Sequence, residues 1–183
     1  MIVLVTGGNR GIGFGIVQAI TQRIPNATIL IGCREIKSGE ESISKLQELG
    51  VTATLDTIKV DVEDDDTIAA AAEVVRTKYR KLDGMLIASS VYCYTPSNRL
   101  AVLINNAAQM TFASSSELSE VRSAMNKNVN NAVTSQAIVT RAFLPLLRQS
   151  EFPRVIMVSS ARGSLGMTAK KEAGLQHPPM INT

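Results

Sequence analysis

The sequence predicts an α/β domain built on a doubly wound parallel sheet. Three observations indicate this fold: strand-like apolar runs alternate with amphipathic stretches, the apolar content is aliphatic, and a glycine-rich turn follows the first strand. Of the 183 residues, 45% are hydrophobic but only 4% are aromatic. Aliphatic side chains fill parallel sheets that are buried on both faces.

The alternation of elements is regular enough to give each a range. The expected strands span residues 2–5, 27–33, 54–60, 102–104 and 155–158, and the expected helices about 11–23, 38–50, 67–79 and 117–148. In the first helix, Ile12, Ile16 and Ile20 recur every four residues. Ser38 followed by Glu41 is a capping-box pattern that would open the second helix. The length allows one domain, covering residues 1–183.

Composition and residue counts exclude several functional classes. The 19 basic and 16 acidic residues are interleaved and leave a formal net charge of +3, so no stripe for nucleic acid or anionic lipid is expected. Cys33 and Cys93 lie far apart and His177 is the only histidine, which argues against a metal site or a Ser-His-Asp triad. We expect a cytoplasmic protein with reduced cysteines and no nucleic-acid or membrane partner.

The clearest functional signal is the run TGGNRGIG at residues 6–13, directly after a strand and at the start of a helix. Glycines let the backbone approach a pyrophosphate, and the helix N-terminus supplies unpaired N–H groups and the positive end of the helix dipole. The alternative is a glycine-rich turn without a ligand. The strand-turn-helix context favours a dinucleotide phosphate site.

This run resembles the TGxxxGxG fingerprint of the short-chain dehydrogenases/reductases. Further motifs recur in that family's order: Asp61-Val62, NNAA at 105–108 and VIMVSS at 155–160. The resemblance is of the carbonyl-reductase-like or fungal type and covers nearly the whole chain. It implies a Rossmann-like NAD(P)-binding domain that transfers hydride between the nicotinamide and a small carbonyl or alcohol substrate.

The resemblance also assigns residues to the cofactor. The expected cofactor-binding residues are Thr6, Gly7, Asn9, Arg10, Gly11, Ile12, Gly13, Arg34, Asp61, Val62, Asn106 and Ala107. Asp61 and Val62 would contact the adenine, and Asn106 would lie beside the adenosine ribose. Without the resemblance, Asp61 would be interpreted as a turn or cap residue and Asn106 as part of a structural turn.

Cofactor choice depends on the end of the second strand. An NAD enzyme has a carboxylate there, about 20 residues past the glycine turn. Arg34 occupies this place, and with Arg10 it is predicted to clamp the 2'-phosphate of NADP(H). Two alternatives stay open: Arg34 pairs with Glu35 at the surface, or Glu35 itself binds a ribose hydroxyl.

Two residues match catalytic positions of the family. Ser160 matches the serine that hydrogen-bonds the substrate carbonyl oxygen, and Asn128 matches the asparagine that holds a water of the proton relay. Counted back from Pro145, the chain is about one helical turn longer than the family pattern, which leaves Asn131 and Ala132 as alternatives to Asn128. A strand-end serine and a surface asparagine are the structural alternatives.

The family's acid, a tyrosine in a Tyr-x-x-x-Lys pair, has no match. Tyr79, Tyr92 and Tyr94 all precede Ser160, and none has a lysine four residues later. The resemblance therefore implies a chain truncated before this pair, with a doubly wound parallel sheet that is incomplete at its C-terminal end. The parent activity would be an NADP-dependent oxidoreductase, and we expect this chain to be inactive. The alternative is a non-catalytic dinucleotide-binding protein or an inactive product derived from the family.

A second departure is an insertion at about 84–100, between segments that the family joins almost directly. A loop of about 17 residues inside a compact βαβ core is uncommon. Three explanations stay open: a translated intron, an additional strand, or an insertion at the sheet edge or over the site.

Overall fold

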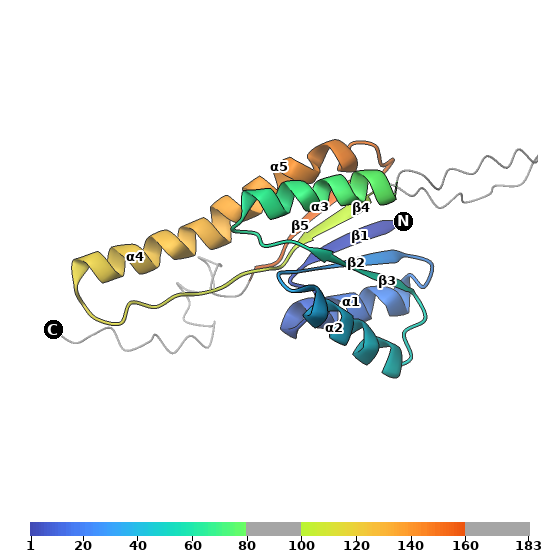
Figure 1. Cartoon of the computed structure of the whole chain (residues 1–183), viewed down its shortest axis with the longest axis horizontal. Helices are drawn as coiled ribbons and strands as arrows, with labels where there is room; N and C mark the ends of the chain where they lie inside the picture. Colours follow the sequence, from blue (N-terminus) through green and yellow to red (C-terminus); the bar gives the residue numbers. More distant parts are fainter. Residues whose placement is uncertain (80–99, 160–183) are drawn as a thin grey trace, which may run out of the picture.

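The computed structural model describes residues 1–79 and 100–159 (Figure 1). Its strands are β1 (Ile2–Thr6), β2 (Thr28–Cys33), β3 (Thr54–Lys59), β4 (Leu100–Asn105) and β5 (Arg154–Met157). Its helices are α1 (Gly11–Arg23), α2 (Ile36–Glu48), α3 (Asp65–Lys78), α4 (Leu118–Val129), the π-helical turn η1 (Asn130–Thr134) and α5 (Ser135–Leu147). None of the helices in these two stretches has the length and apolar character needed to cross a bilayer.

The strands form one sheet in the order β3-β2-β1-β4-β5, and every neighbouring pair is parallel. Helices α1 and α2 cover one face of the sheet, and α3 and α5 cover the other (Figure 1). The predicted doubly wound α/β fold is therefore confirmed. The strand order reverses between β1 and β4, and the crevice at the carboxyl ends of those strands is where such sheets bind ligands.

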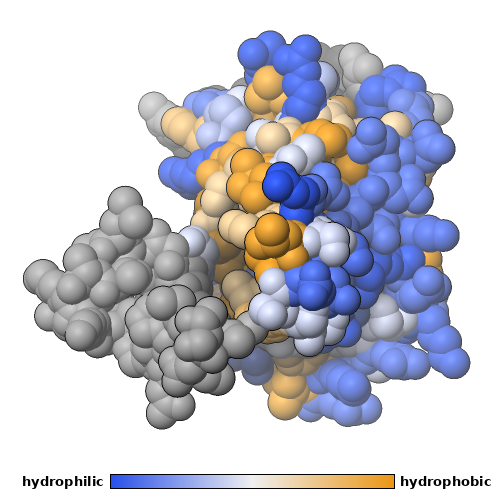
Figure 2. Space-filling model, turned by 90° about the vertical axis from the view of Figure 1, so that its left-hand side faces the viewer, coloured by the Kyte–Doolittle hydropathy of each residue, from blue (hydrophilic) through white to orange (hydrophobic). Residues whose placement is uncertain are grey.

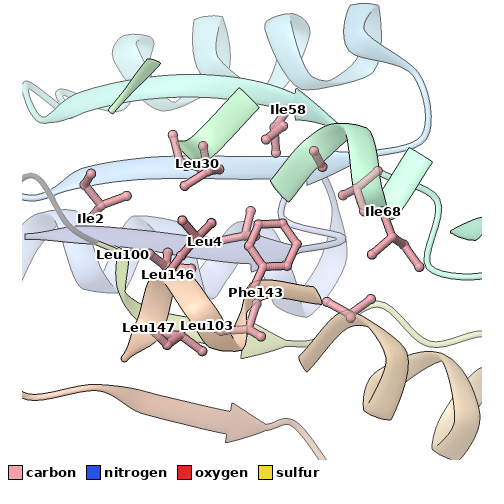
Figure 3. Packing of buried hydrophobic residues seen from close by; sticks show 14 of the residues in the cluster. Ile2, Leu4, Leu30, Ile58, Ile68, Leu100, Leu103, Phe143, Leu146 and Leu147 are labelled. Carbon is pink, nitrogen blue, oxygen red and sulfur yellow. The ribbon is translucent and has the colours of Figure 1, made fainter. Parts of the chain in front are cut away.

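Side chains of the central strands alternate between two apolar clusters. Ile2 and Leu4 of β1 pack toward α3 and α5, where Phe143 is fully buried (Figure 3). Val3 and Val5 belong to the second cluster, with residues of α1 and α2. Because successive side chains point to opposite faces, a strand covered on both faces must be apolar throughout. This packing holds the carboxyl ends of β1 and β4 in place.

The helix starts differ in part from the predictions. The capping box at Ser38 is wrong, because α2 begins at Ile36 with Glu35 at its N-cap. Ser38 already lies in the first turn, where its hydroxyl donates to the Glu35 carbonyl at 2.7 Å. At α3, Asp64 caps the helix by accepting two backbone N–H groups of the first turn.

Two predicted ranges change. The helix expected over 117–148 is interrupted by η1, in which the Ser135 N–H bonds to the Asn130 carbonyl five residues back. Strand β4 begins at Leu100, which pairs with Ile2, so Leu100 belongs to the sheet and not to the insertion. The remainder of the expected insertion lies outside the described residues.

Candidate functional site

The glycine turn joins β1 to α1 where the strand order reverses. Gly7 has a φ of 64° and Gly11 a φ of 54°, left-handed values that favour glycine. A Cβ on Gly13 would lie 2.1 Å from the Gly7 carbonyl oxygen and 2.6 Å from Nδ2 of Asn106. At Gly11, in contrast, no neighbouring group of the described residues comes within 4 Å of the Cβ position. The turn is thus closed underneath by Gly13 and open at Gly11.

The buried hydroxyl of Thr6 ties this turn to the end of β4. Its oxygen accepts the N–H groups of Asn106 at 3.0 Å and Ala107 at 3.1 Å, and it donates to the Ile104 carbonyl at 3.3 Å. The Asn106 amide in turn donates to the carbonyls of Thr6 at 3.0 Å and Gly7 at 3.3 Å. The ends of β1 and β4 therefore form one hydrogen-bonded unit.

The β2–α2 connection lies beside the glycine turn. Nδ2 of Asn9 donates to the hydroxyl of Ser38 at 3.1 Å. The N–H groups of Gly7 and Gly8 both point to the Gly32 carbonyl, at 2.8 and 3.3 Å. These bonds bring the residue that follows β2, Arg34, to the same edge of the sheet as the turn.

Both arginines predicted to recognise a 2'-phosphate are exposed. Arg34 follows β2 directly, and Arg10 is the N-cap residue of α1. Neither guanidinium makes an ion pair or hydrogen bond with any residue of 1–79 or 100–159, so the alternative pairing of Arg34 with Glu35 is not formed. Burial raises the pKa of the neighbouring Cys33 thiol, which favours the neutral, unreactive form of this cysteine.

Asp61 and Val62 lie in the loop after β3, the next strand along this edge. One carboxylate oxygen of Asp61 accepts the Glu63 N–H at 3.1 Å. The Thr67 hydroxyl accepts the Asp61 N–H at 2.9 Å and donates to the Asp61 carbonyl at 3.1 Å. Val62 is buried. Asp61 therefore has the turn role expected of its position, within a loop that several hydrogen bonds hold in shape.

The candidates for the active-site asparagine differ in their surroundings. Asn128 is half-buried, and its amide bonds both backbone groups of Thr111, at 2.7 Å to the N–H and 2.8 Å to the carbonyl. Asn131 is buried, and its Oδ1 accepts the Gln109 N–H at 2.6 Å. Ala132 is exposed. Both asparagines thus hold the chain that follows β4.

The predicted catalytic serine, Ser160, lies outside the described residues. The chain is described up to Ser159, which is exposed, and the N–H of Val158 donates to the Asn105 carbonyl at 3.0 Å. Pairing between β4 and β5 therefore continues to the carboxyl edge of the sheet. Whether Ser160 acts at this edge stays a prediction.

Sequence reasoning missed a polar group on α5. Nε2 of Gln136 donates to the Ala107 carbonyl at 2.7 Å, and Nδ2 of Asn105 donates to the Thr140 hydroxyl at 2.9 Å. Oδ1 of Asn105 and Oε1 of Gln136 are buried and have no hydrogen-bond partner among residues 1–79 and 100–159. In the sequence, Gln136 stands in a long predicted helix shortly after Asn130 and Asn131. This position alone does not distinguish it from a surface residue.

The sequence matches the short chain dehydrogenase family over residues 1–171. The chain belongs to this family. Among curated relatives of this short-chain dehydrogenase, a short-chain dehydrogenase/reductase of Aspergillus fumigatus is 36% identical over 179 residues, 97% of this chain and 61% of that protein. Salutaridine reductase of Papaver somniferum is 28% identical over 187 residues, 93% of this chain and 57% of that protein. The chain thus spans less than two thirds of either relative.

Solved structures share the fold of this short-chain dehydrogenase. A metagenomic short-chain oxidoreductase in complex with NADP has a TM-score of 0.67 at 20% identity, over 90% of this chain and 64% of that chain. The structure of salutaridine reductase from Papaver somniferum has a TM-score of 0.65 at 22% identity, over 90% and 58%. These structures support the fold, and the match to the family model confirms the family resemblance inferred from the motifs.

Proposed function

We propose that this chain binds NADP(H) across the carboxyl ends of β1, β2 and β4. The observation that supports this most strongly is the shape of the glycine turn, which Gly13 closes from below and Gly11 leaves open. The first N–H groups of a helix have no intrahelical acceptor, and the first turn of α1 contains no acidic residue. A diphosphate placed there would meet unpaired donors and no repelling charge.

The remaining contacts follow from the positions of the loops around this turn. The residues we propose to hold the cofactor are Thr6, Gly7, Asn9, Arg10, Gly11, Ile12, Gly13, Arg34, Asp61, Val62, Asn106 and Ala107. Asp61 and Val62 would line the adenine end, beyond the β2 terminus. Ile12 is 71% exposed at the start of α1, so its side chain is available to a ligand and not used by the core.

NADP(H) is favoured over NAD(H) by the charge at the β2 terminus. A free guanidinium stands where an NAD-binding site would need a carboxylate for the ribose hydroxyls. Arg34 and Arg10 are both exposed and unpaired within the described part of the chain. Guanidinium groups bind phosphate bidentately and stay charged, so the 2'-phosphate would gain two cationic partners.

A titration of NADPH and NADH against the wild type, Arg34→Asp and Arg122→Asp tests this proposal. Because the 2'-phosphate would gain charge-assisted hydrogen bonds from the arginines, we expect the wild type to bind NADPH at least about tenfold more tightly than NADH. Arg34→Asp should remove that preference. Arg122→Asp makes the same change in net charge on exposed α4 and should retain it. Equal affinities in the wild type, or an unchanged preference in Arg34→Asp, would contradict the role of Arg34.

The proposed chemistry of the parent protein is hydride transfer with a small carbonyl or alcohol substrate. The bound nicotinamide would supply or accept the hydride. We propose that Ser160 polarises the substrate carbonyl and that Asn128, or its alternative Asn131, contributes to the proton relay. Figure 2, which faces the side where α4 begins, shows hydrophobic surface flanked by hydrophilic surface. Met110 and Phe112, which follow β4, are 58% and 66% exposed, and such side chains suit a partly apolar substrate.

We further propose that this 183-residue chain binds the cofactor without turning over substrate. No tyrosine in the chain is followed by a lysine four residues later. General acid catalysis contributes about a hundredfold to ten-thousandfold, and neither serine nor asparagine is an acid of suitable pKa. NADPH oxidation should be measured with aldehydes, diketones and quinones. The assay compares the 183-residue chain with a version extended through a Tyr-x-x-x-Lys helix. Robust turnover by the 183-residue chain would contradict this proposal.

A further inference from the structure

The segment after β4 is held along one side by three side-chain amides. This strap, residues 107–111, runs beside α4 and α5 with its backbone bonded at every second residue. The bonds join Gln136 to the carbonyl of Ala107 at 2.7 Å, Asn131 to the N–H of Gln109 at 2.6 Å, and Asn128 to the N–H and carbonyl of Thr111 at 2.7 and 2.8 Å. In an extended chain, backbone groups of alternate residues point to the same side. One edge of the strap is therefore pinned along its whole length.

The π-helical turn η1 is what allows Gln136 to take part. Residues five apart in an α-helix lie about 140° apart around the axis, so Gln136 would face away from the strap if the helix were regular. In η1 the Ser135 N–H bonds to the Asn130 carbonyl five residues back, and this wider turn brings residues five apart above one another. Gln136 thereby shares a face with Asn131, and with Asn128 three residues earlier.

The strap begins at the wall of the proposed cofactor site. A Cβ on Gly7 would lie 3.1 Å from Cα of Ala107, so Ala107 packs directly against the glycine turn. The Ala107 N–H is bonded by Thr6 and its carbonyl by Gln136. Both polar groups of this peptide segment are therefore committed, one to β1 and one to α5.

The same turn also reaches the other wall of the site. Nδ2 of Asn130 donates to Oε1 of Glu63 at 3.2 Å, and Glu63 follows the proposed adenine contacts Asp61 and Val62. Adjacent asparagines of η1 thus contact the loop after β3 and the strap after β4. One helical turn touches both segments between which a dinucleotide would lie.

We propose that Gln136 is a positioning residue of the cofactor site, which acts by fixing Ala107 through the π-helical turn. This inference rests on the proposed binding of NADP(H). The Ala107 carbonyl has a single side-chain donor in the described stretches, and replacing Gln136 by an apolar residue leaves that carbonyl without it. The strap would keep the bonds of Asn131 and Asn128 at its far end, but at its near end only the bond from the Ala107 N–H to Thr6 would remain. The wall at Gly7 would then be fixed less firmly.

The test compares Gln136→Met, which matches the length of the side chain but has no donor, with Asn126→Leu. Asn126 is an exposed amide of α4 that bonds to nothing in the described residues. Amide hydrogen exchange of the full chain is measured first, without cofactor. In Gln136→Met, exchange should be faster at residues 107–111 but not in β2 or α3. A general loss of stability would instead speed exchange everywhere, and Asn126→Leu should match the wild type.

Cofactor titration is the second measurement. Gln136 lies on α5 and not among the 2'-phosphate residues, so Gln136→Met should weaken the binding of NADPH and of NADH by the same factor. We expect about tenfold for the loss of this part-buried hydrogen bond. The preference between them should not change, unlike in Arg34→Asp. Unchanged affinities, or unchanged exchange in the strap, would overturn the inference. If the wild type bound neither cofactor, the proposed function would fail, and the exchange comparison would still decide whether Gln136 fixes the strap.

Discussion

The backbone on the two sides of the crevice is fixed by different interactions. On the β1–β2 side every residue of β1 is buried, and the shape of the glycine turn is enforced by the absence of side chains at Gly7 and Gly13. On the β4–β5 side every residue of β5 is exposed, and the strap is held by amides that lie 17 to 29 residues away in the chain. The first side is fixed by local sterics, and the second by distant hydrogen bonds.

This difference determines how each side should respond to mutation. Added atoms in a close-packed backbone turn cannot be accommodated by side-chain rotation, so a single methyl group should abolish the geometry. A lost amide bond leaves one unsatisfied carbonyl but leaves the neighbouring bonds intact. We therefore expect large effects in the glycine turn and graded effects along the strap.

The largest expected effect is that of Gly13→Ala. Its Cβ would meet the Gly7 carbonyl at 2.1 Å, and relieving such a contact should lower the free energy of unfolding by about 3 kcal/mol and abolish NADPH binding. Gly15→Ala is the matched control, because in the part of the chain that the structure describes nothing lies within 4 Å of that Cβ position. It should stabilise α1 by about 0.5–1 kcal/mol. Urea unfolding of both variants checks this, and equal stabilities would contradict the packed turn.

A smaller effect is expected where the two sides are joined. Thr6→Val removes the hydroxyl that bonds Asn106, Ala107 and Ile104, and should lower the free energy of unfolding by about 2 kcal/mol. Thr6→Ser keeps the hydroxyl and should cost less than half of that, which reflects only the lost methyl group. If the two variants were equally unstable, the bond network across β1 and β4 would not be responsible.

On the strap itself, Asn131→Leu and Asn128→Leu compare a buried with a half-buried amide. The loss of the Asn131 bond to Gln109 should cost about 1–2 kcal/mol of unfolding free energy, because the Asn131 side chain that makes this bond is buried. Asn128→Leu should cost less, since the Asn128 side chain is only half-buried and water can replace its bonds more easily. Urea denaturation distinguishes them. The reverse order would show that burial does not set the strength of the strap bonds.

The smallest effect is expected far from the crevice, on edge strand β3. Burial by itself raises the pKa of the Asp56 carboxyl, but hydrogen bonds from Lys78 and Tyr79 outweigh it and hold this pKa below its usual value. The ionised Asp56 carboxylate therefore stabilises the folded state above the unfolded pKa of about 4. This stabilisation is lost as the pH falls through the lower pKa of the folded state. Because solvent screens this pair, with the Lys78 side chain 59% and the Asp56 side chain 31% exposed, Asp56→Asn should cost at most about 1 kcal/mol at neutral pH.

The pH dependence supplies the check on this last prediction. The difference in unfolding free energy between the wild type and Asp56→Asn should shrink between pH 5 and pH 3, while cofactor affinity at neutral pH stays the same. A difference that grew on acidification would mean that the folded state does not favour the ionised carboxylate.

The contrast between the two sides also explains what could be predicted from sequence. The glycine turn and Arg34 are fixed by their distance along the chain from β1 and β2, so a linear pattern was sufficient to place them. The repeat of Ile12, Ile16 and Ile20 predicted the helix correctly but not its buried face, since Ile12 is 71% exposed while Val17 is fully buried. The buried face of α1 runs through Gly13, Val17 and Thr21, because only a glycine at residue 13 allows α1 to pack against the turn.

The strap could not be predicted in the same way. A regular helix would place Gln136 and Asn131 on different sides, and nothing in the run NNAVTSQ marks a π-helical turn. The extra helical length noted by counting back from Pro145 lies where η1 occurs, but it gave no side-chain direction. The capping box at Ser38 failed for a related reason, since the pattern also fits a serine one turn inside a helix.

The most direct test of the account is amide hydrogen exchange of the full chain with and without saturating NADPH. We predict slower exchange at residues 6–13 and at Arg34 when NADPH is present, and no change in β5. The Gly13→Ala variant should show no slowing. If exchange at residues 6–13 were the same with and without NADPH, the glycine turn would not be a cofactor site and the central proposal would be contradicted.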